Sequence, residues 1–227
     1  MNAADRITVV IPALDEAAGI GAAVRAAAAH ARRVIVVDGG SRDATPTLAA
    51  DAGALVVTAP RGRASQMNAG AAVADTDWLL FLHADCRLPE GAAGAIAAAS
   101  AAGRRWGRFD VRLVSSRPSL AVVGTMMNLR SRATAIATGD QAIFIERGLF
   151  GSVGGYAPIR LMEDIELCVR LRRIARPACV PLRVEVSARR WERRGVMRTV
   201  LEMWVWRAAY ALGASPEWLH RRYYGRR

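Results

Sequence analysis

An α/β fold with a mostly parallel central sheet and helices on both faces is predicted by three observations. Short apolar runs rich in β-branched residues alternate with Ala-rich segments through the first 103 residues. The runs are continuously apolar, as in strands that are buried on both faces. Turn-forming residues and acids follow the runs in succession. We therefore expect a single domain, extended at its C-terminus by a helix.

The first half of the chain is predicted as alternating strands and helices. Pro12 ends the first strand, and Thr45-Pro46 provide an N-cap and a first helical residue for the second helix. The expected strands are Arg6–Pro12, Val34–Val37, Ala54–Ala59 and the apolar part of Asp77–Asp85. The expected helices are Asp15–Arg33, Thr45–Gly53, Ala64–Ala74 and a segment from Glu90 to Gly103.

The pattern changes after residue 103. Trp106–Leu113 alternates apolar and polar residues, as a half-exposed strand does. Met162–Ala175 carries acids in its first turn and arginines in its last, which matches the helix dipole. The other expected elements are a helix within Pro118–Gly139, a strand and turn in Asp140–Phe150, an extended segment at Ala178–Trp191 and a final amphipathic helix at Gly195–Gly213.

Composition excludes several mechanisms. The chain has 227 residues with a hydrophobic fraction of 52%, which is enough for a substantial core. Its net charge is +12, and all 32 basic residues are arginine. Without lysine there is no Walker A lysine and no Schiff-base lysine. The charge favours an anionic partner such as a nucleotide, a phospholipid or a nucleic acid, although base composition of the genome explains arginine richness equally well.

The cysteines and the terminal segments predict a cytoplasmic protein. Cys86, Cys168 and Cys179 are far apart and odd in number, which favours free thiols in a reducing compartment. No segment resembles a signal peptide, and no apolar window is long enough to span a membrane.

Acids follow three of the expected strands. Asp15 and Glu16 follow the first strand, Asp38 the second, and Asp85 the fourth. In parallel sheets the carboxyl ends of the strands form one edge, where ligands bind. Carboxylates beside an anionic ligand repel it unless a hard cation such as Mg²⁺ or Mn²⁺ intervenes, and His83 offers a nitrogen ligand that suits Mn²⁺ better. The alternative is that His83 and Asp85 are loop residues that cap the helix after Pro89, and that Asp38 caps the next turn.

Six segments resemble, in order and spacing, the motifs of family 2 glycosyltransferases of the GT-A fold. They are VVIPALDEAAGI, VIVVDGGSRDAT, GRASQMNAGAAVA, WLLFLHADCRLP, TGDQAIFIER and MEDIELCVRLRR, and the similarity extends from Arg6 to Arg194. The segments GRFDVRL, MMNLRSR and ATGDQAIF resemble in particular a bacterial subfamily of arsenosugar-biosynthesis glycosyltransferases associated with radical-SAM and selenodomain proteins. The resemblance implies that residues 1–103 form the nucleotide-binding half of one GT-A domain, 104–194 its acceptor and catalytic half, and 195–227 an amphipathic helix with a basic tail.

The resemblance implies a role for each matching residue. Nucleotide-sugar binding is assigned to Pro12, Ala13, Asp15, Glu16, Asp38, Arg63, Gln66, Asn68, Ala84 and Asp85. The acceptor and donor-sugar side is assigned to Gly139, Asp140, Gln141, Arg190 and Trp191. The metal ligands are Asp85, which matches the last acid of the D-x-D motif, and His83, which replaces the first. Glu163 and Asp164 match the catalytic E-D pair, although acids there would also stabilise a helix N-terminus.

The implied reaction is an inverting displacement with Asp164 as the base. The expected partners are a uridine diphosphate sugar, a divalent cation and an unidentified hydroxyl acceptor. Ser187 stands where processive members have the glutamine of their Q-x-x-R-W motif, which argues against polymer synthesis. Two other functions were weighed: a sugar nucleotidyltransferase, whose basic phosphate loop after the first strand is absent, and a non-enzymatic arginine-rich protein. Acids at the strand ends argue against nucleic-acid binding.

The final helix has two interpretations. Its apolar and aromatic residues, flanked by arginines, would suit an anionic membrane surface at the inner face of the cell membrane. Alternatively it packs on the catalytic domain or forms a homodimer contact, which is the interpretation that we favour from sequence.

Overall fold

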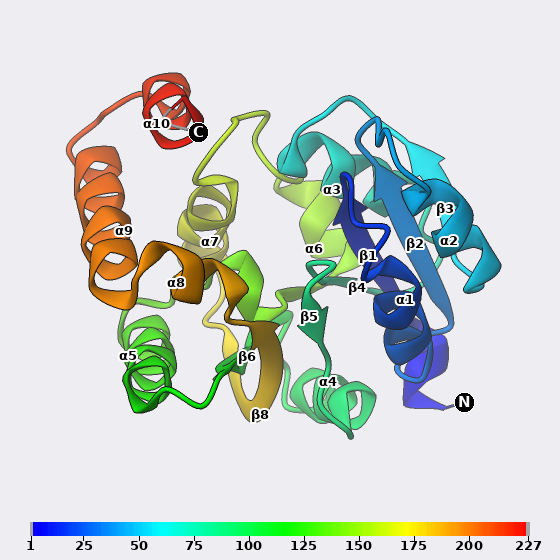
Figure 1. Ribbon diagram of the computed structural model, residues 1–227. Helices are drawn as coiled ribbons and strands as arrows, with labels where there is room; N and C mark the ends of the chain where they lie inside the picture. The colour runs from blue at the N-terminus through cyan, green and yellow to red at the C-terminus, as the bar shows by residue number, and fades with distance from the viewer. Residues whose placement is uncertain (1, 226–227) are drawn as a thin grey trace.

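One mixed sheet runs through the whole domain, in the strand order β3-β2-β1-β4-β7-β6-β8-β5 (Figure 1). The computed structural model describes residues 2–225, apart from the side chains of Arg190 and Tyr224. The strands are β1 (Ile7–Ala13), β2 (Arg33–Asp38), β3 (Leu55–Thr58), β4 (Trp78–Phe81), β5 (Cys86–Arg87), β6 (Trp106–Val114), β7 (Phe144–Glu146) and β8 (Ala178–Ser187).

The first four strands of this order are parallel and form the half of the sheet predicted from the apolar runs. β1 pairs with β2 and with β4, and β2 pairs with β3, all in parallel. β7 pairs antiparallel with β4 and β6, whereas β6 and β8 pair in parallel. Because β1, β2 and β4 are parallel neighbours, the loops that follow them meet at one edge, as the sequence predicted.

Helices cover both faces of the sheet. They are α1 (Ile20–Ala28), α2 (Thr45–Asp51), α3 (Arg63–Ala72), α4 (Ala92–Ala101), α5 (Pro118–Thr134), α6 (Arg147–Ser152), α7 (Glu163–Ile174), α8 (Arg189–Arg194), α9 (Val196–Ala211) and α10 (Pro216–Tyr224), with 3-10 turns η1 (Ala3–Arg6) and η2 (Gly139–Gln141). The apolar residues of β1, β2 and β4 alternate between two core clusters. One cluster contains residues of α1, α2, α4 and α5, and the other contains residues of α3, α6 and α7. This arrangement confirms the α/β fold class.

A glycine allows α3 to approach the sheet closely. A Cβ atom on Gly70 would lie 2.4 Å from Val10 Cγ1 and 2.9 Å from Val37 Cγ2. Only glycine fits this contact, which sets the N-terminal half of α3 against the carboxyl ends of β1 and β2.

Several predicted elements differ from the structure. The helix expected from Asp15 begins at Ile20, because Asp15 has a positive φ of 56° and its loop bonds to side chains of residues 41–45. The helix expected to reach Gly139 ends at Thr134, where Ala135 adopts a left-handed conformation. The segment expected to be extended to Trp191 becomes α8 after Ser187. The sequence analysis also missed α10, although Ser215 and Pro216 are a typical N-cap and N1 pair.

The predicted division near residue 104 falls in the connection between α4 and β6. The same sheet continues on both sides of that connection, so the two predicted halves share one core. Among residues 2–225, the structure contains no helix with the length and apolar character needed to cross a bilayer.

Candidate active site

The loops after β1 and β2 hold each other in place at the sheet edge. Asp38, at the end of β2, is buried, and its carboxylate accepts hydrogen bonds from the backbone N–H groups of Gly40 and Ser41. The Ser41 hydroxyl donates to Asp38 and accepts from the Asp15 N–H at 2.9 Å. Asp15 in turn accepts from the Arg42 N–H at 2.8 Å. These bonds match the turn-capping interpretation of Asp38; its predicted contact with a base or ribose stays a prediction.

Gln66 joins the ends of β1 and β2 from below. Its amide nitrogen donates to the carbonyl oxygens of Ala13 and Val37, each at 2.8 Å. The side chain is only 4% exposed. Gln66 therefore holds the end of β1, at Pro12 and Ala13, against the end of β2. Its role in this structure is to position the loops that follow these strands.

Two other residues assigned to ligand binding make structural contacts. The Asn68 amide donates to the Tyr156 carbonyl oxygen at 2.8 Å and accepts from the Tyr156 N–H at 2.9 Å. Gln141 is fully buried and accepts from the Thr138 N–H at 3.2 Å. Both side chains thus hold neighbouring backbone segments in place beside the site.

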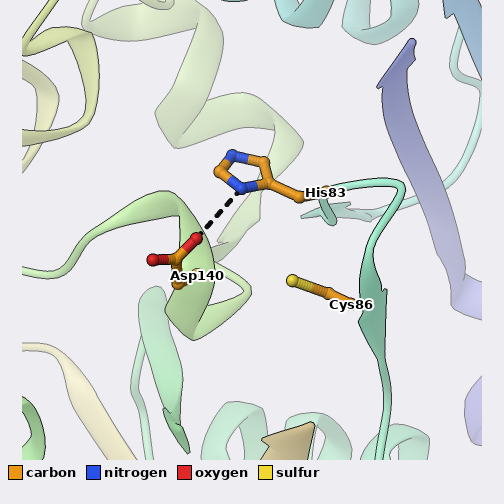
Figure 2. A group of neighbouring side chains, drawn as sticks. All are labelled: His83, Cys86 and Asp140. Carbon is orange, nitrogen blue, oxygen red and sulfur yellow. Dashed lines mark hydrogen bonds and ion pairs between the residues drawn. The ribbon is translucent and has the colours of Figure 1, made fainter. Parts of the chain in front are cut away.

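His83 and Asp140 form the centre of the candidate site, as Figure 2 shows. His83 Nδ1 lies 3.2 Å from Asp140 Oδ1, although the two residues are 57 positions apart. His83 follows β4, and Asp140 lies in η2. A Cβ atom on Gly139 would lie 2.3 Å from His83 Nε2, so the imidazole packs directly on the glycine backbone. This close approach requires glycine at position 139.

Cys86 completes a group of three candidate metal donors. Ligand atoms of His83, Cys86 and Asp140 all lie within 4.8 Å of one another, and Figure 2 shows the Cys86 sulfur on the strand below His83. Burial, followed by the charges of Asp140 and Asp85, raises the pKa of the Cys86 thiol well above its ordinary value. A protonated thiol is a poor ligand for a hard cation. The donor set that fits Mg²⁺ or Mn²⁺ is thus the Asp140 carboxylate with the His83 imidazole.

Asp85 is exposed on the turn after β4, next to this group. Its charge is the second cause, after burial, that raises the pKa of Glu16. Two strand-end carboxylates therefore crowd each other, as the sequence predicted. A divalent cation would relieve that repulsion, so the site fits one electrostatically. The neighbouring Ala84 is half-buried.

Glu163 and Asp164 open α7 on the other side of the site. Asp164 accepts hydrogen bonds from the Gly139 N–H at 3.0 Å and the Ile165 N–H at 2.7 Å. Glu163 is 4% exposed, and burial, followed by repulsion from Asp164, raises the pKa of its carboxyl. Arg63 Nη1 lies 3.8 Å from Glu163 Oε1. The paired acids are therefore joined to η2 and to the start of α3.

Arg130 on α5 was not identified from sequence. Its Nε and Nη2 atoms are buried and have no hydrogen-bond partner in the described part of the chain. Burial lowers the pKa of the Arg130 guanidinium, whereas the nearby charges of Asp164 and Asp140 raise it. Arg130 belongs to the segment MMNLRSR, but the sequence assigns it no role, and only the fold brings it near these two acids.

The last two predicted acceptor-side residues lie on α8. Trp191 is 6% exposed and packs in the core cluster with residues of α5 and β6. The side chain of Arg190 lies outside the described residues. Their acceptor-side role stays a prediction.

The fold matches solved structures of glucosyl-3-phosphoglycerate synthase from Mycobacterium tuberculosis. The complex with Mg²⁺ and uridine diphosphate aligns with 21% identity and a TM-score of 0.57 over 80% of this chain and 70% of that one. The complex with Mn²⁺, UDP-glucose and phosphoglyceric acid gives 21% and 0.59 over 80% and 71%. At this identity the likeness establishes the fold, which is GT-A.

Sequence comparison gives the family. The model of Glycosyl transferase family 2 matches residues 8–122, just over half of the chain, so this protein belongs to glycosyl transferase family 2. Uncharacterized glycosyltransferases of Mycobacterium tuberculosis (strain H37Rv) and Mycobacterium bovis are 41% identical over 90 residues, which is 39% of this chain. The match spans about two fifths (41%) of the length of these relatives.

Proposed function

We propose that this enzyme transfers a sugar from a uridine diphosphate sugar to a hydroxyl acceptor, with inversion at the anomeric carbon. The observation that carries the proposal is the convergence of His83, Asp140 and Asp164 beside the strand-end loops of a family 2 chain. Structures of similar fold that bind uridine diphosphate or UDP-glucose with Mg²⁺ or Mn²⁺ support the choice of donor.

Asp164 is the proposed base. An acceptor hydroxyl must lose its proton as it attacks, so a carboxylate has to face it. The two backbone N–H groups that Asp164 accepts from fix the orientation of the carboxylate and still leave lone pairs for a proton. Glu163 is buried and tied to Arg63, so we propose that it positions the start of α7.

His83, Asp85 and Asp140 are the residues that would hold the divalent cation. When bound, such a cation neutralises the charge that develops on a diphosphate leaving group. The chain adds positive charge of its own from Arg63, Arg130 and Arg189, because Arg189 is close enough to Glu16 to lower its pKa. These arginines would attract the donor before the reaction and hold the diphosphate afterwards.

The narrower assignment to arsenosugar biosynthesis remains part of the proposal. It is supported by the segments GRFDVRL, MMNLRSR and ATGDQAIF. The same segments form most of β6, the second half of α5, which contains Arg130, and η2, which contains Asp140. The proposal therefore places the acceptor against these elements. Position 187 is serine, so a single transfer is proposed in preference to polymer synthesis.

A thermal-shift panel tests donor and metal together. UDP-, GDP- and dTDP-sugars are each added with and without Mn²⁺, and UDP-sugars with Mn²⁺ should raise the melting temperature most. Equal shifts for all nucleotides, or shifts independent of Mn²⁺, would contradict the proposed donor site.

The anomer released tests inversion separately. With water as acceptor, slow hydrolysis of UDP-glucose should release β-glucose first, which proton NMR detects before mutarotation. Release of α-glucose first would overturn the inverting mechanism while leaving the donor assignment intact.

A further inference from the structure

An apolar stripe runs along the solvent side of α9. Met197, Leu201, Trp204 and Val205 are 71%, 61%, 70% and 58% exposed. Their spacing puts them on one face of the helix. The adjoining side of the helix packs on the domain through Val196, Val200 and Met203. The expectation that this helix packs on the domain thus describes only one of its two faces.

A second stripe lies on α5, at the same end of the molecule (Figure 1). Val122, Met126 and Leu129 are 62%, 56% and 54% exposed, and they repeat at the same helical spacing. Leu120 and Met127, on the other side of α5, belong to the core cluster on which α9 also packs. We call the seven exposed residues of the two stripes the apolar face: Val122, Met126, Leu129, Met197, Leu201, Trp204 and Val205.

The apolar face lies in strongly basic surroundings. Residues 189–225 contain eight arginines and three glutamates, a net charge of +5. Arg193 is exposed at the end of α8, and Arg198, in the first turn of α9, pairs with Glu202 while its side chain stays 72% exposed. Exposed tryptophan and aliphatic side chains with arginines beside them are typical of a helix that lies in a membrane interface.

We propose that the apolar face of α5 and α9 binds an anionic lipid bilayer, with the two helices lying in the plane of its surface. A second copy of the chain is the competing occupant. In a two-fold dimer the same surface meets itself, so each basic segment would approach another of the same charge. An anionic bilayer meets those arginines with opposite charge, which favours binding.

Vesicle co-sedimentation of the full chain tests the proposal. The wild-type protein should sediment with phosphatidylcholine vesicles that contain phosphatidylglycerol, and less with pure phosphatidylcholine. Leu201→Glu combined with Trp204→Glu should lower the partition coefficient by about tenfold or more, since each substitution removes a large apolar contact. Met126→Glu on α5 should weaken binding too. Arg193→Gln combined with Arg198→Gln should cause a loss of about tenfold that high salt reproduces.

Val73→Glu is the matched control, because Val73 is 44% exposed at the end of α3, away from the apolar face. It should bind vesicles as the wild type does. Circular dichroism verifies that each variant is folded. Absence of binding to anionic vesicles, or binding unchanged by either glutamate substitution, would overturn the proposal. The proposal would also fail if light scattering showed that the wild-type protein is a dimer, that Leu201→Glu dissociates it, and that the protein does not bind vesicles.

Discussion

The two sides of the candidate site differ in how their polar groups are satisfied. In the loops after β1 and β2, the Asp38 carboxylate accepts from Ser41, the Asp15 carboxylate accepts from the Arg42 N–H, and the Glu16 N–H donates to Thr45. On the side formed by η2, α5 and α7, two buried polar atoms, Arg130 Nε and Thr138 Oγ1, have no hydrogen-bond partner among the residues that the structure describes.

The difference indicates that the loops after β1 and β2 are a scaffold, which we call the scaffold side. The side formed by η2, α5 and α7 is arranged to bind ligands, and we call it the ligand side. A buried polar group without a partner costs about 1–3 kcal/mol, so a fold retains it where something else supplies the partner. The hydrogen bonds that hold the loops of β1 and β2 together form without a ligand, and the Glu16 carboxylate, which Asp85 repels, is the exception on this side. The wall of η2, α5 and α7 concentrates buried charge around Asp164, and we expect catalytic losses to be concentrated there.

The largest effect should come from Asp164→Asn. The amide cannot accept the acceptor's proton, so kcat should fall by about 10²- to 10⁴-fold while donor affinity stays close to that of the wild type. Uridine diphosphate release from the donor selected by the thermal-shift panel gives kcat, and calorimetry gives affinity. Glu166→Gln is the control, because Glu166 lies in the same helical turn and pairs with Arg170. Equal losses of affinity and turnover would show that Asp164 binds the donor instead.

The next effect concerns the cation. Asp140→Ala and Asp85→Ala should each weaken Mn²⁺-dependent donor binding by about 10- to 100-fold, since both remove a carboxylate from the His83 region. Asp77→Ala, at the opposite end of β4 and paired with Arg6, is the control and should change nothing. If calorimetry finds Mn²⁺-dependent affinity intact in Asp85→Ala, the cation is held by the His83–Asp140 pair alone.

The scaffold side was the more predictable of the two from sequence. Continuous apolar runs identify β1, β2 and β4, and an acid after each run identifies the edge, because both signals are local. The loop from Asp15 to Gly19 was expected to be helical from its alanines. Its backbone N–H groups are bound instead by Ser41, Asp43 and Thr45, about 26–29 positions later.

The ligand side depends on contacts that no local pattern encodes. His83 meets Asp140 across 57 residues, and Arg130 faces Asp164 from another helix. The family resemblance placed His83, Asp140 and Asp164 individually. It did not show that Gly139 packs on His83, or that Cys86 lies in the same group.

Glu163→Gln should show that the buried Glu163 carboxylate lowers the stability of the fold in a pH-dependent way. The pKa of the folded carboxyl is raised from 4.5 by burial and then by Asp164, so the folded state holds the proton more tightly than the unfolded state. Stability therefore falls as pH rises from about the ordinary value through the raised pKa, and glutamine avoids that loss. Urea unfolding from acid to neutral pH should show that the free energy of unfolding of the variant rises relative to that of the wild type as pH increases. If the difference in free energy of unfolding between the variant and the wild type did not change with pH, burial of the charged Glu163 carboxylate would not destabilise the fold.

The smallest effect should come from Ser41→Ala on the scaffold side. Alanine removes the acceptor for the Asp15 N–H and a donor to Asp38, so the free energy of unfolding should fall by about 1 kcal/mol. Donor affinity should fall modestly, because the loops lose rigidity, whereas kcat should hold since no polar group near Asp164 changes. Ser152→Ala is the control, because its hydroxyl bonds only within α6. A loss of kcat comparable to that of Asp164→Asn would mean that the loops of β1 and β2 take part in the chemical step, and the contrast between the two sides would fail.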